Sequence, residues 1–186
     1  ILALYGRNYN QFPPQGLSSN DSFFSFSASP EERPARFYAG IMGVGTNRMN
    51  EIVISKATLG FGRYLLKNEK NAKEKGVVIA YDNRFNHEKF MMAAANVLTS
   101  LGIKVYLFED LRSTPELSFA VRHLQCVGGI MVTASHNPPK YNGYKVYDEK
   151  GCQLVPELAD VVINKIDAIE DIFSIPVREY NELLQE

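Results

Sequence analysis

The chain has 186 residues, 45% of them hydrophobic, and its 20 basic and 21 acidic residues give a formal net charge of -1. This length fits one large domain, and the apolar fraction is sufficient for a substantial core. The balanced charge argues against nucleic acid as a partner, because binding to a phosphate backbone usually shows as a basic excess.

The sequence also argues against a membrane protein. No apolar run approaches the roughly 18 residues that span a bilayer, and no signal segment opens the chain. Cys126 and Cys152 are far apart and match no metal-ligand spacing. Isolated thiols of this kind are typical of a reducing compartment, so we expect a cytoplasmic protein without a membrane partner.

Residues 1–36 differ in composition from the rest of the chain. They are rich in Ser, Pro, Phe and Asn, and they show no sustained hydrophobic period. Pro13, Pro14 and Pro30 would interrupt any helix there. We therefore predict an irregular N-terminal arm over 1–36 and a single domain over 37–186.

Helices and strands alternate from about residue 50. Apolar residues at helical spacing predict a helix over 50–68, with Asn50 as its cap. Asn86 is expected to cap a second helix, which Gly102 ends. The other predictions are strands over 76–82, 103–109 and 127–134, a helix over 115–125 that begins with a proline, a hairpin over 143–155 that turns near 149–151, and a helix over 156–172.

This alternation predicts an α/β fold with three layers, α/β/α, around a mixed, mostly parallel sheet. In such sheets, ligands bind beyond the carboxyl ends of the strands. Three polar segments follow predicted strands: Asp82 with Arg84, Ser113 with Thr114, and Ser135. We expect these three segments to converge on one edge of the sheet.

Ser135 and His136 raise the possibility of a serine hydrolase. The serine is flanked by Ala134 and His136, which departs from the G-x-S-x-G turn of α/β-hydrolases. Neighbouring side chains of an extended segment point apart, so His136 is not expected to act as the base for Ser135. A serine on an exposed tip can instead carry a phosphoryl group, and that interpretation fits the loop better.

The stretch TASHNPPKYNGYKVY, residues 133–147, resembles the phosphoserine loop of the α-D-phosphohexomutases, the phosphoglucomutase and phosphomannomutase family. The family pattern is Thr-(Ala/Gly)-Ser-His-Asn-Pro followed by Asn-Gly-(Tyr/Phe)-Lys, and this chain contains all of it. The segments 40–50 and 113–122 are similar to the family's N-terminal glycine loop and to the segment before the serine strand. The resemblance implies the first α/β/α domain of such an enzyme.

The resemblance also implies roles for individual residues. Ser135 would be the phosphorylated serine, and its phosphate would complete a Mg²⁺ site. Lys145 would be the general base and His136 a positioning group, while Arg48 and Asn137 would bind phosphate. A hexose phosphate would be the substrate and a hexose bisphosphate the activator. Arg84 is interpreted as a support for the serine loop, with a local pair to Asp82 as the alternative.

The chain departs from the family pattern in two ways. Ala39 stands where the motif arginine would precede Gly40, and residues 34–39 lack the family's glycine run, which suggests an altered N-terminal sequence. The metal loop, Asp-Gly-Asp-x-Asp-Arg, and the sugar-recognition loop do not occur in the sequence. We therefore expect this chain to be the first domain of a mutase, with the remaining domains of the same enzyme as its partners.

Two functional hypotheses follow from the sequence. In the first, the chain is the phosphoserine-bearing part of a phosphohexomutase, inactive as an isolated domain. In the second, it is a non-catalytic remnant or binding module that keeps the fold and the serine. The preferred sugar stays open, because the loop that would select it lies in a domain that this sequence does not contain.

Overall fold

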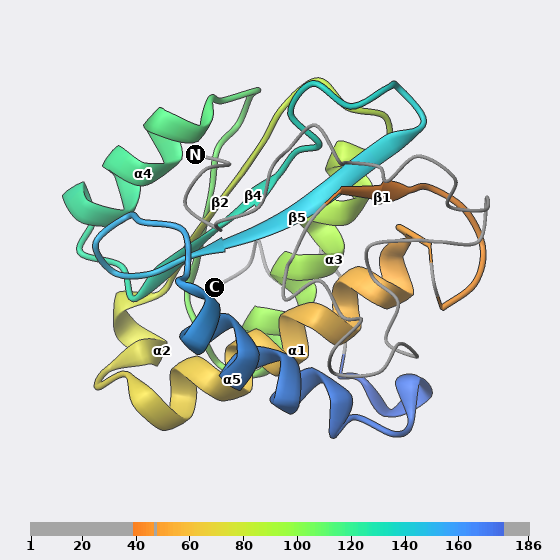
Figure 1. Cartoon of the computed structure of the whole chain (residues 1–186). Coiled ribbons are helices and arrows are strands. Elements are labelled where there is room, and N and C mark those ends of the chain that lie inside the picture. Colours follow the sequence, from red (N-terminus) through yellow and green to blue (C-terminus); the bar gives the residue numbers. More distant parts are fainter. Residues whose placement is uncertain (1–38, 47, 177–186) are drawn as a thin grey trace.

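The computed structural model describes residues 39–46 and 48–176, so the arm predicted over 1–36 lies outside the described residues (Figure 1). Five strands of the described part form one sheet in the order β1-β5-β4-β2-β3. Their bounds are Ala39–Ile41 for β1, Val77–Tyr81 for β2, Val105–Leu107 for β3, Gly128–Val132 for β4 and Tyr141–Tyr147 for β5.

The sheet is mixed in the way that the sequence predicts. Strand β2 pairs in parallel with both β3 and β4. Strand β5 pairs antiparallel with β4 on one side and with β1 on the other. Four strands therefore run in one direction and β5 runs against them, because β5 follows β4 through a loop and not through a crossover helix.

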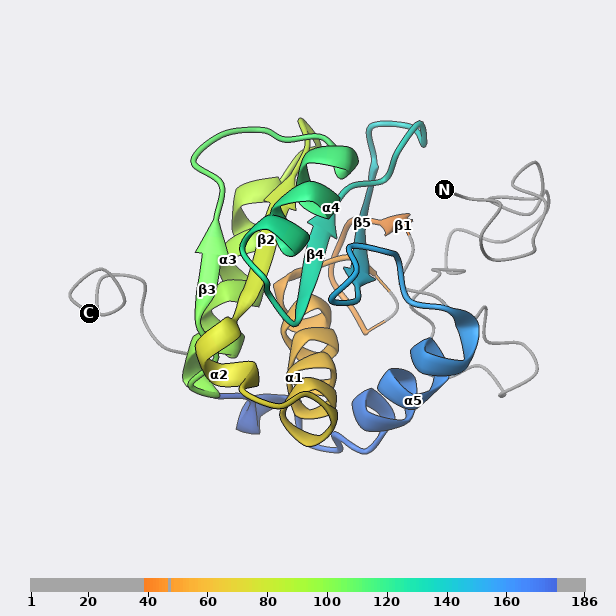
Figure 2. The same cartoon turned by 90° about the vertical axis from the view of Figure 1, so that its left-hand side faces the viewer.

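Helices cover both faces of the sheet, which confirms the α/β fold (Figures 1 and 2). Helix α4 lies on one face, and α1, α3 and α5 lie on the other. None of the described helices is long and apolar enough to cross a membrane. The helix bounds are Glu51–Asn68 for α1, Ala72–Lys75 for α2, His87–Ser100 for α3, Thr114–His123 for α4 and Pro156–Asp167 for α5, with a 3-10 turn η3 over Ile172–Ser174.

Some local expectations were wrong. Asn86 stands at the N-cap of α3 as expected, but its side chain makes no capping hydrogen bond and its backbone is left-handed, with φ of 60°. The second arm of the predicted hairpin is only a bridge between Tyr147 and Gln153. The Asp148 carboxylate accepts the N–H groups of Lys150 and Cys152, at 3.0 and 2.8 Å, and this tightens the turn. Helix α5 also ends before the predicted residue 172.

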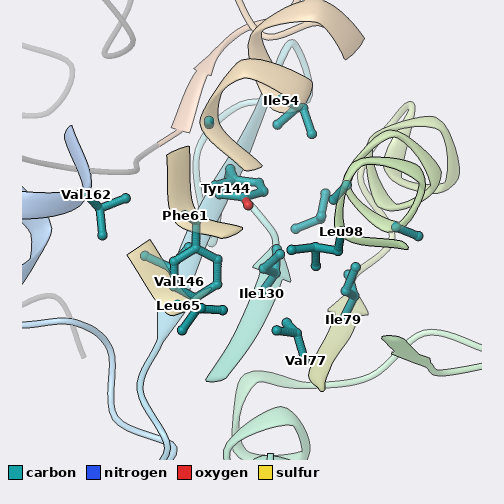
Figure 3. Packing of buried hydrophobic residues seen from close by; sticks show 14 of the residues in the cluster. Ile54, Phe61, Leu65, Val77, Ile79, Leu98, Ile130, Tyr144, Val146 and Val162 are labelled. Carbon is teal, nitrogen blue, oxygen red and sulfur yellow. The ribbon is translucent and has the colours of Figure 1, made fainter. Parts of the chain in front are cut away.

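The larger part of the core lies between the sheet and α1, α3 and α5 (Figure 3). Tyr144 of β5 is fully buried there. Its hydroxyl lies 2.9 Å from Oγ1 of Thr58, which also donates to the Ile54 carbonyl at 2.8 Å. The phenol therefore has a partner inside the apolar layer, where an unpaired hydroxyl would be costly. This contact fixes β5, the strand that carries Lys145, against α1.

Two glycines let neighbouring helices approach α1 closely. A Cβ atom on Gly60 would lie 2.3 Å from Cγ1 and 2.9 Å from the backbone nitrogen of Ile166 in α5. A Cβ atom on Gly62 would lie 2.4 Å from Cδ1 of Leu101, which is the end of a flexible side chain. Gly60 therefore meets backbone, whereas Gly62 meets a group that can move.

We predict that Gly60→Ala lowers the free energy of unfolding by about 1–3 kcal/mol, because α5 must shift to make room. Gly62→Ala is the matched control. Its smaller clash is offset by the better helix propensity of alanine, worth about 1 kcal/mol. Urea unfolding of both variants measures the difference. Equal stability of the two variants would contradict the close approach of α1 and α5.

Candidate active site

The candidate site is the loop that joins β4 to β5, residues 133–140, which we call the serine loop. It begins where β4 ends, at the carboxyl edge of the parallel strands. The Asn137 N–H donates to the Ala134 carbonyl at 3.1 Å, and the Tyr141 N–H donates to the Pro138 carbonyl at 2.9 Å. These turns leave Ser135 exposed at the tip, with a left-handed backbone at φ of 56°.

Thr133 connects the serine loop to the end of β2. Its hydroxyl donates to the Oδ2 atom of Asp82. The Thr133 Oγ1 atom also accepts the N–H of Ser135 at 2.9 Å. The second carboxylate oxygen of Asp82 accepts the Arg84 N–H at 3.3 Å. The first turn of the serine loop is thus held by a neighbouring strand.

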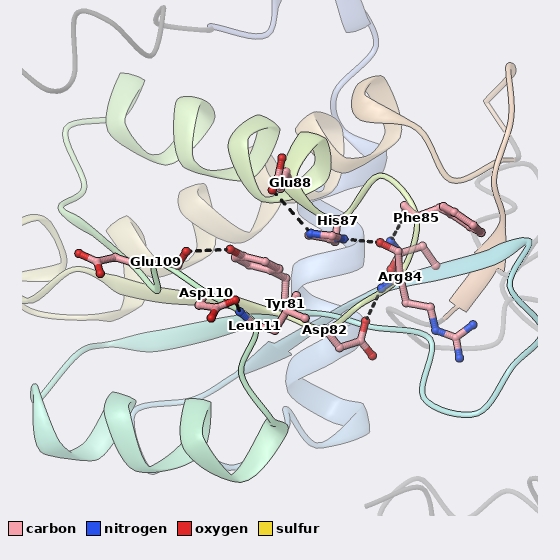
Figure 4. Close-up of polar contacts among 10 residues, drawn as sticks. Tyr81, Asp82, Arg84, Phe85, His87, Glu88, Glu109, Asp110 and Leu111 are labelled. Carbon is pink, nitrogen blue, oxygen red and sulfur yellow. Dashed lines mark hydrogen bonds and ion pairs between the residues drawn. The ribbon is translucent and has the colours of Figure 1, made fainter.

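Arg84 holds the same loop through its backbone carbonyls. The guanidinium Nη1 donates to the carbonyls of Asn137 and Pro138, the latter at 3.0 Å, and Nη2 donates to the carbonyl of Ser135. In Figure 4, Arg84 extends from the end of β2 beside Asp82, next to the chain that joins β4 and β5. The carbonyl of Arg84 in turn contacts the Nδ1 atom of His87. Arg84 therefore supports the serine loop, and the alternative of a merely local pair with Asp82 is not needed.

His136 lies closer to the serine hydroxyl than the sequence suggested. Its Nδ1 atom is 3.2 Å from Oγ of Ser135, and both side chains are exposed. The expectation that the two side chains point apart was wrong, because Ser135 is left-handed and not extended. The ring can therefore exchange a proton with the serine hydroxyl or orient it.

Lys145 lies on β5, opposite Met131 of β4, and only 5% of it is exposed. Burial lowers the pKa of this lysine below its ordinary value, and the negative charge of Asp82 partly opposes the shift. Tyr144 and Val132 point into the core on the α1 side. Strand alternation therefore places Lys145 on the opposite face of the sheet.

Arg48 lies in a second loop, residues 42–50 between β1 and α1, which we call the glycine loop. The Asn50 side chain shapes this loop by donating to the carbonyls of Gly43 and Gly45, at 2.9 and 2.8 Å. The Met42 N–H donates to the carbonyl of Lys140 at 2.9 Å, which ties the glycine loop to the serine loop. Arg48 is half-buried, and its phosphate-binding role stays a prediction.

The other expected residues are placed as follows. Asn137 is buried within the serine loop, and its carbonyl accepts Arg84, so the structure gives it a place in the loop. Ser113 serves α4 instead of the site: its N–H and hydroxyl both donate to the Glu116 carboxylate, at 2.7 and 2.8 Å. Sequence reasoning missed the link from Asp82 to Thr133, although both residues follow predicted strands and the carboxyl ends of parallel strands lie at one edge of the sheet.

A metal site is not complete within the described part of the chain. Residues 39–46 and 48–176 contain no group of three or more His, Cys, Asp or Glu side chains placed to hold a metal ion. Mg²⁺ needs near-octahedral oxygen coordination. The exposed Ser135 hydroxyl offers one oxygen, or a phosphate if it is modified. These residues alone do not fit a Mg²⁺ site.

The fold and the site together are those of an α/β/α domain with an exposed serine loop at the carboxyl edge of its sheet. Residues 38–172 match the family model described as phosphoglucomutase/phosphomannomutase, alpha/beta/alpha domain I. Because the match covers most of the chain, the protein belongs to the phosphoglucomutase/phosphomannomutase family. The resemblance seen in the serine loop is thereby confirmed.

Relatives with the printed names of mutases support the same family. A phosphoglucomutase of Staphylococcus saprophyticus is 43% identical over 143 residues, which cover 77% of this chain and 25% of the relative. A human phosphopentomutase is 46% identical over 120 residues, which cover 61% of this chain and 20% of the relative. The chain thus spans a quarter or less of the length of these curated relatives.

Solved structures show the same fold. A Thermus thermophilus protein described as a phosphomannomutase superimposes with a TM-score of 0.60 at 33% identity, over 77% of this chain and 30% of that protein. A phosphoglucomutase/phosphomannomutase family protein of Burkholderia thailandensis gives 0.57 at 25% identity, over 69% and 28%. A domain of similar fold therefore occurs as one part of longer proteins.

The buried Lys145 generates a prediction on pH. Its pKa is lowered in the folded protein, so between that value and the ordinary 10.5 the unfolded chain binds a proton that the folded protein does not. Lys145→Met should therefore stabilise the domain at pH 7, by about 2–4 °C if the change is about 1 kcal/mol. This advantage should shrink as the pH rises toward 10.5.

Thermal melts at several pH values measure the effect, with the exposed Lys89→Met as the matched control. The control should change stability little, because Lys89 is exposed. A Lys145→Met variant that is less stable than the wild type, or whose advantage stays constant up to pH 10.5, would contradict a buried amine whose pKa is lowered by burial.

Proposed function

We propose that this chain is the phosphoserine-bearing domain of a phosphohexomutase, in which Ser135 passes a phosphoryl group to and from a sugar phosphate. The observation that carries the proposal is the placement of Ser135. It lies exposed at the tip of a loop whose backbone is held by the side chains of Arg84, just beyond β2, and of Thr133. A serine that exchanges a phosphoryl group with a substrate must be both accessible and held in a fixed geometry, whereas a serine that only follows a strand needs neither.

The proposed reaction needs two proton movements. In the first half, the bond between phosphorus and Ser135 Oγ breaks while a sugar hydroxyl forms a new bond to phosphorus. Lys145 takes the proton of that hydroxyl, for which its amine must be neutral, and its lowered pKa supports this role. The Ser135 oxygen regains a proton, and His136 is near enough to supply or orient it.

The second half of the reaction reverses these steps. The sugar bisphosphate turns over in the site and returns its other phosphoryl group to Ser135. His136 takes back the proton of the Ser135 hydroxyl as its oxygen bonds phosphorus, and the proton held by Lys145 goes back to the sugar oxygen that loses its phosphoryl group, so no atom or charge is left over. We propose Arg48 and Asn137 as phosphate-binding groups, because the glycine loop is tied to the serine loop.

The cofactors and partners of the complete enzyme are part of the proposal. Mg²⁺ would neutralise phosphate charge, with Ser135 phosphate as one ligand and the other ligands outside the residues described. A hexose bisphosphate would serve as the activator that loads the serine. A longer mutase would supply the remaining domains, in keeping with the share of the relatives that this chain covers. We infer a cytoplasmic location from the isolated cysteines.

The first test of this function is the phosphorylation of Ser135. Incubation of the complete enzyme with glucose 1,6-bisphosphate should add one phosphate to the peptide that contains Ser135, as seen by intact mass and peptide mapping. Ser135→Ala should abolish both the label and the mutase activity. Ser113→Ala is the matched control, since Ser113 serves the α4 cap. Phosphate on other residues alone would contradict the assignment.

The second test separates the enzyme from the alternative, a binding module that keeps the fold without turnover. That alternative is favoured by the lack of a metal-ligand group among the described residues. The 186-residue chain alone should not convert glucose 1-phosphate to glucose 6-phosphate in a coupled assay, whereas the complete protein should. Turnover by the isolated chain would contradict our placement of the metal site, and an inactive complete protein would favour the binding module.

A further inference from the structure

The backbone of Ser135 is held on both sides by one segment of the chain, residues 82–84. The Ser135 N–H is bound by Thr133, whose hydroxyl is bound by Asp82. The Ser135 carbonyl is bound by the Arg84 guanidinium. Both hydrogen-bonding groups of this one residue therefore depend on side chains from the end of β2.

The hydrogen bonds from Ser135 to Asp82 have a fixed direction. A hydroxyl has one hydrogen to donate, and Thr133 donates it to the Asp82 carboxylate, which can only accept. The free lone pairs of Thr133 Oγ1 must then face a donor, and the Ser135 N–H lies there at 2.9 Å. The bond to Asp82 thus orients the threonine hydroxyl so that its oxygen can accept from the serine backbone.

This support has a physical reason. A residue other than glycine in the left-handed region costs about 1–2 kcal/mol relative to the ordinary conformations. Ser135 has φ of 56°, and such a conformation persists only where its surroundings require it. Thr133 is buried, with 4% of its surface exposed, so water competes little for its hydroxyl. The hydrogen bonds of Asp82, Thr133 and Arg84 provide surroundings of this kind.

We propose that Asp82, Thr133 and Arg84 are positioning residues that hold Ser135 in its left-handed conformation and so aim its hydroxyl at the incoming phosphoryl group. None of the three bonds the serine hydroxyl in these contacts, so they act through the backbone. The role of these residues in phosphoryl transfer rests on the function proposed above. Their role in fixing the conformation of the serine loop is independent of that function.

The first experiment measures the loop in the 186-residue chain without any substrate. Thr133→Val should raise the amide hydrogen exchange rate of Ser135 at least tenfold and lower the ¹⁵N heteronuclear NOE across residues 134–138. Thr133→Ser keeps the hydroxyl and should resemble the wild type. Thr99→Val is the matched control, because the Thr99 hydroxyl bonds only carbonyls of its own helix, Ala95 and Asn96. Unchanged exchange and NOE in Thr133→Val would overturn the proposal.

A second variant keeps the test decisive if Thr133→Val unfolds. Arg84→Met removes the donors to the Ser135 and Pro138 carbonyls and should mobilise the same residues, as judged by the same NOE values. Arg122→Met is its control, since Arg122 is exposed and bonds only the Ser118 carbonyl of its own helix. A loop as rigid in Arg84→Met as in the wild type would overturn the proposal.

The kinetic experiment uses the complete enzyme. A misplacement of about 1 Å can cost about a hundredfold in rate. Thr133→Val should therefore lower kcat by about 10- to 100-fold with the KM for glucose 1-phosphate changed less than twofold, and Thr133→Ser should restore kcat. A purely structural role would instead lower the melting temperature and leave kcat per folded molecule intact, which would overturn the positioning role.

The two experiments separate the two proposals. A mobile loop together with an unchanged kcat would contradict the role of these residues in the reaction. A wild-type enzyme that neither turns over nor carries phosphate on Ser135 would contradict the proposed function, while the exchange and NOE measurements would still decide whether Asp82, Thr133 and Arg84 hold the loop.

Discussion

The parallel pairing of β2 with β4 is the constraint on which the site depends. Tyr81 and Val132 are partners in the last step of this register, and the Asp82 N–H extends the ladder by donating to the Val132 carbonyl at 3.2 Å. Asp82 and Thr133 therefore leave the sheet side by side. As a result, the carboxylate of Asp82 and the guanidinium of Arg84 contact the serine loop, although they are about 50 positions away in the sequence. A shift of one residue in this register would turn Asp82 to the other face of the sheet.

The site also contains features that work against stability. Lys145 is nearly fully buried, although its amine is charged in the unfolded chain at neutral pH, and Ser135 has a backbone conformation that disfavours any side chain. The surrounding structure tolerates both because the core on the other face is tightly packed, with Tyr144 bonded to Thr58 within α1. Groups that lower stability in this way are typical of functional sites.

The sequence predicts the elements better than it predicts the contacts. The spacing of apolar residues and the glycine that ends a helix reveal the strands and helices, because these signals are local in the sequence. Asn86 shows the limit: asparagine favours both a helix cap and a left-handed backbone, and here the backbone conformation prevails. The left-handed conformation of Ser135 has no local signal, because it follows from hydrogen bonds to Thr133 and Arg84. Strand β1 has only three residues and pairs with β5 about 100 positions away, so no window of sequence reveals it.

Strand β1 also bears on the unusual residue at position 39. The family resemblance leads one to expect an arginine there, and the chain has Ala39. In the sheet, Ala39 pairs with Gly143 and Gly40 pairs with Asn142, and a strand ladder is formed by backbone groups that every residue except proline provides in full. The edge of the sheet therefore forms without the arginine. The change therefore affects electrostatics: if Ser135 carries the proposed phosphate, one positive charge fewer would face it, and Arg48 of the glycine loop is a cation left to offset that charge.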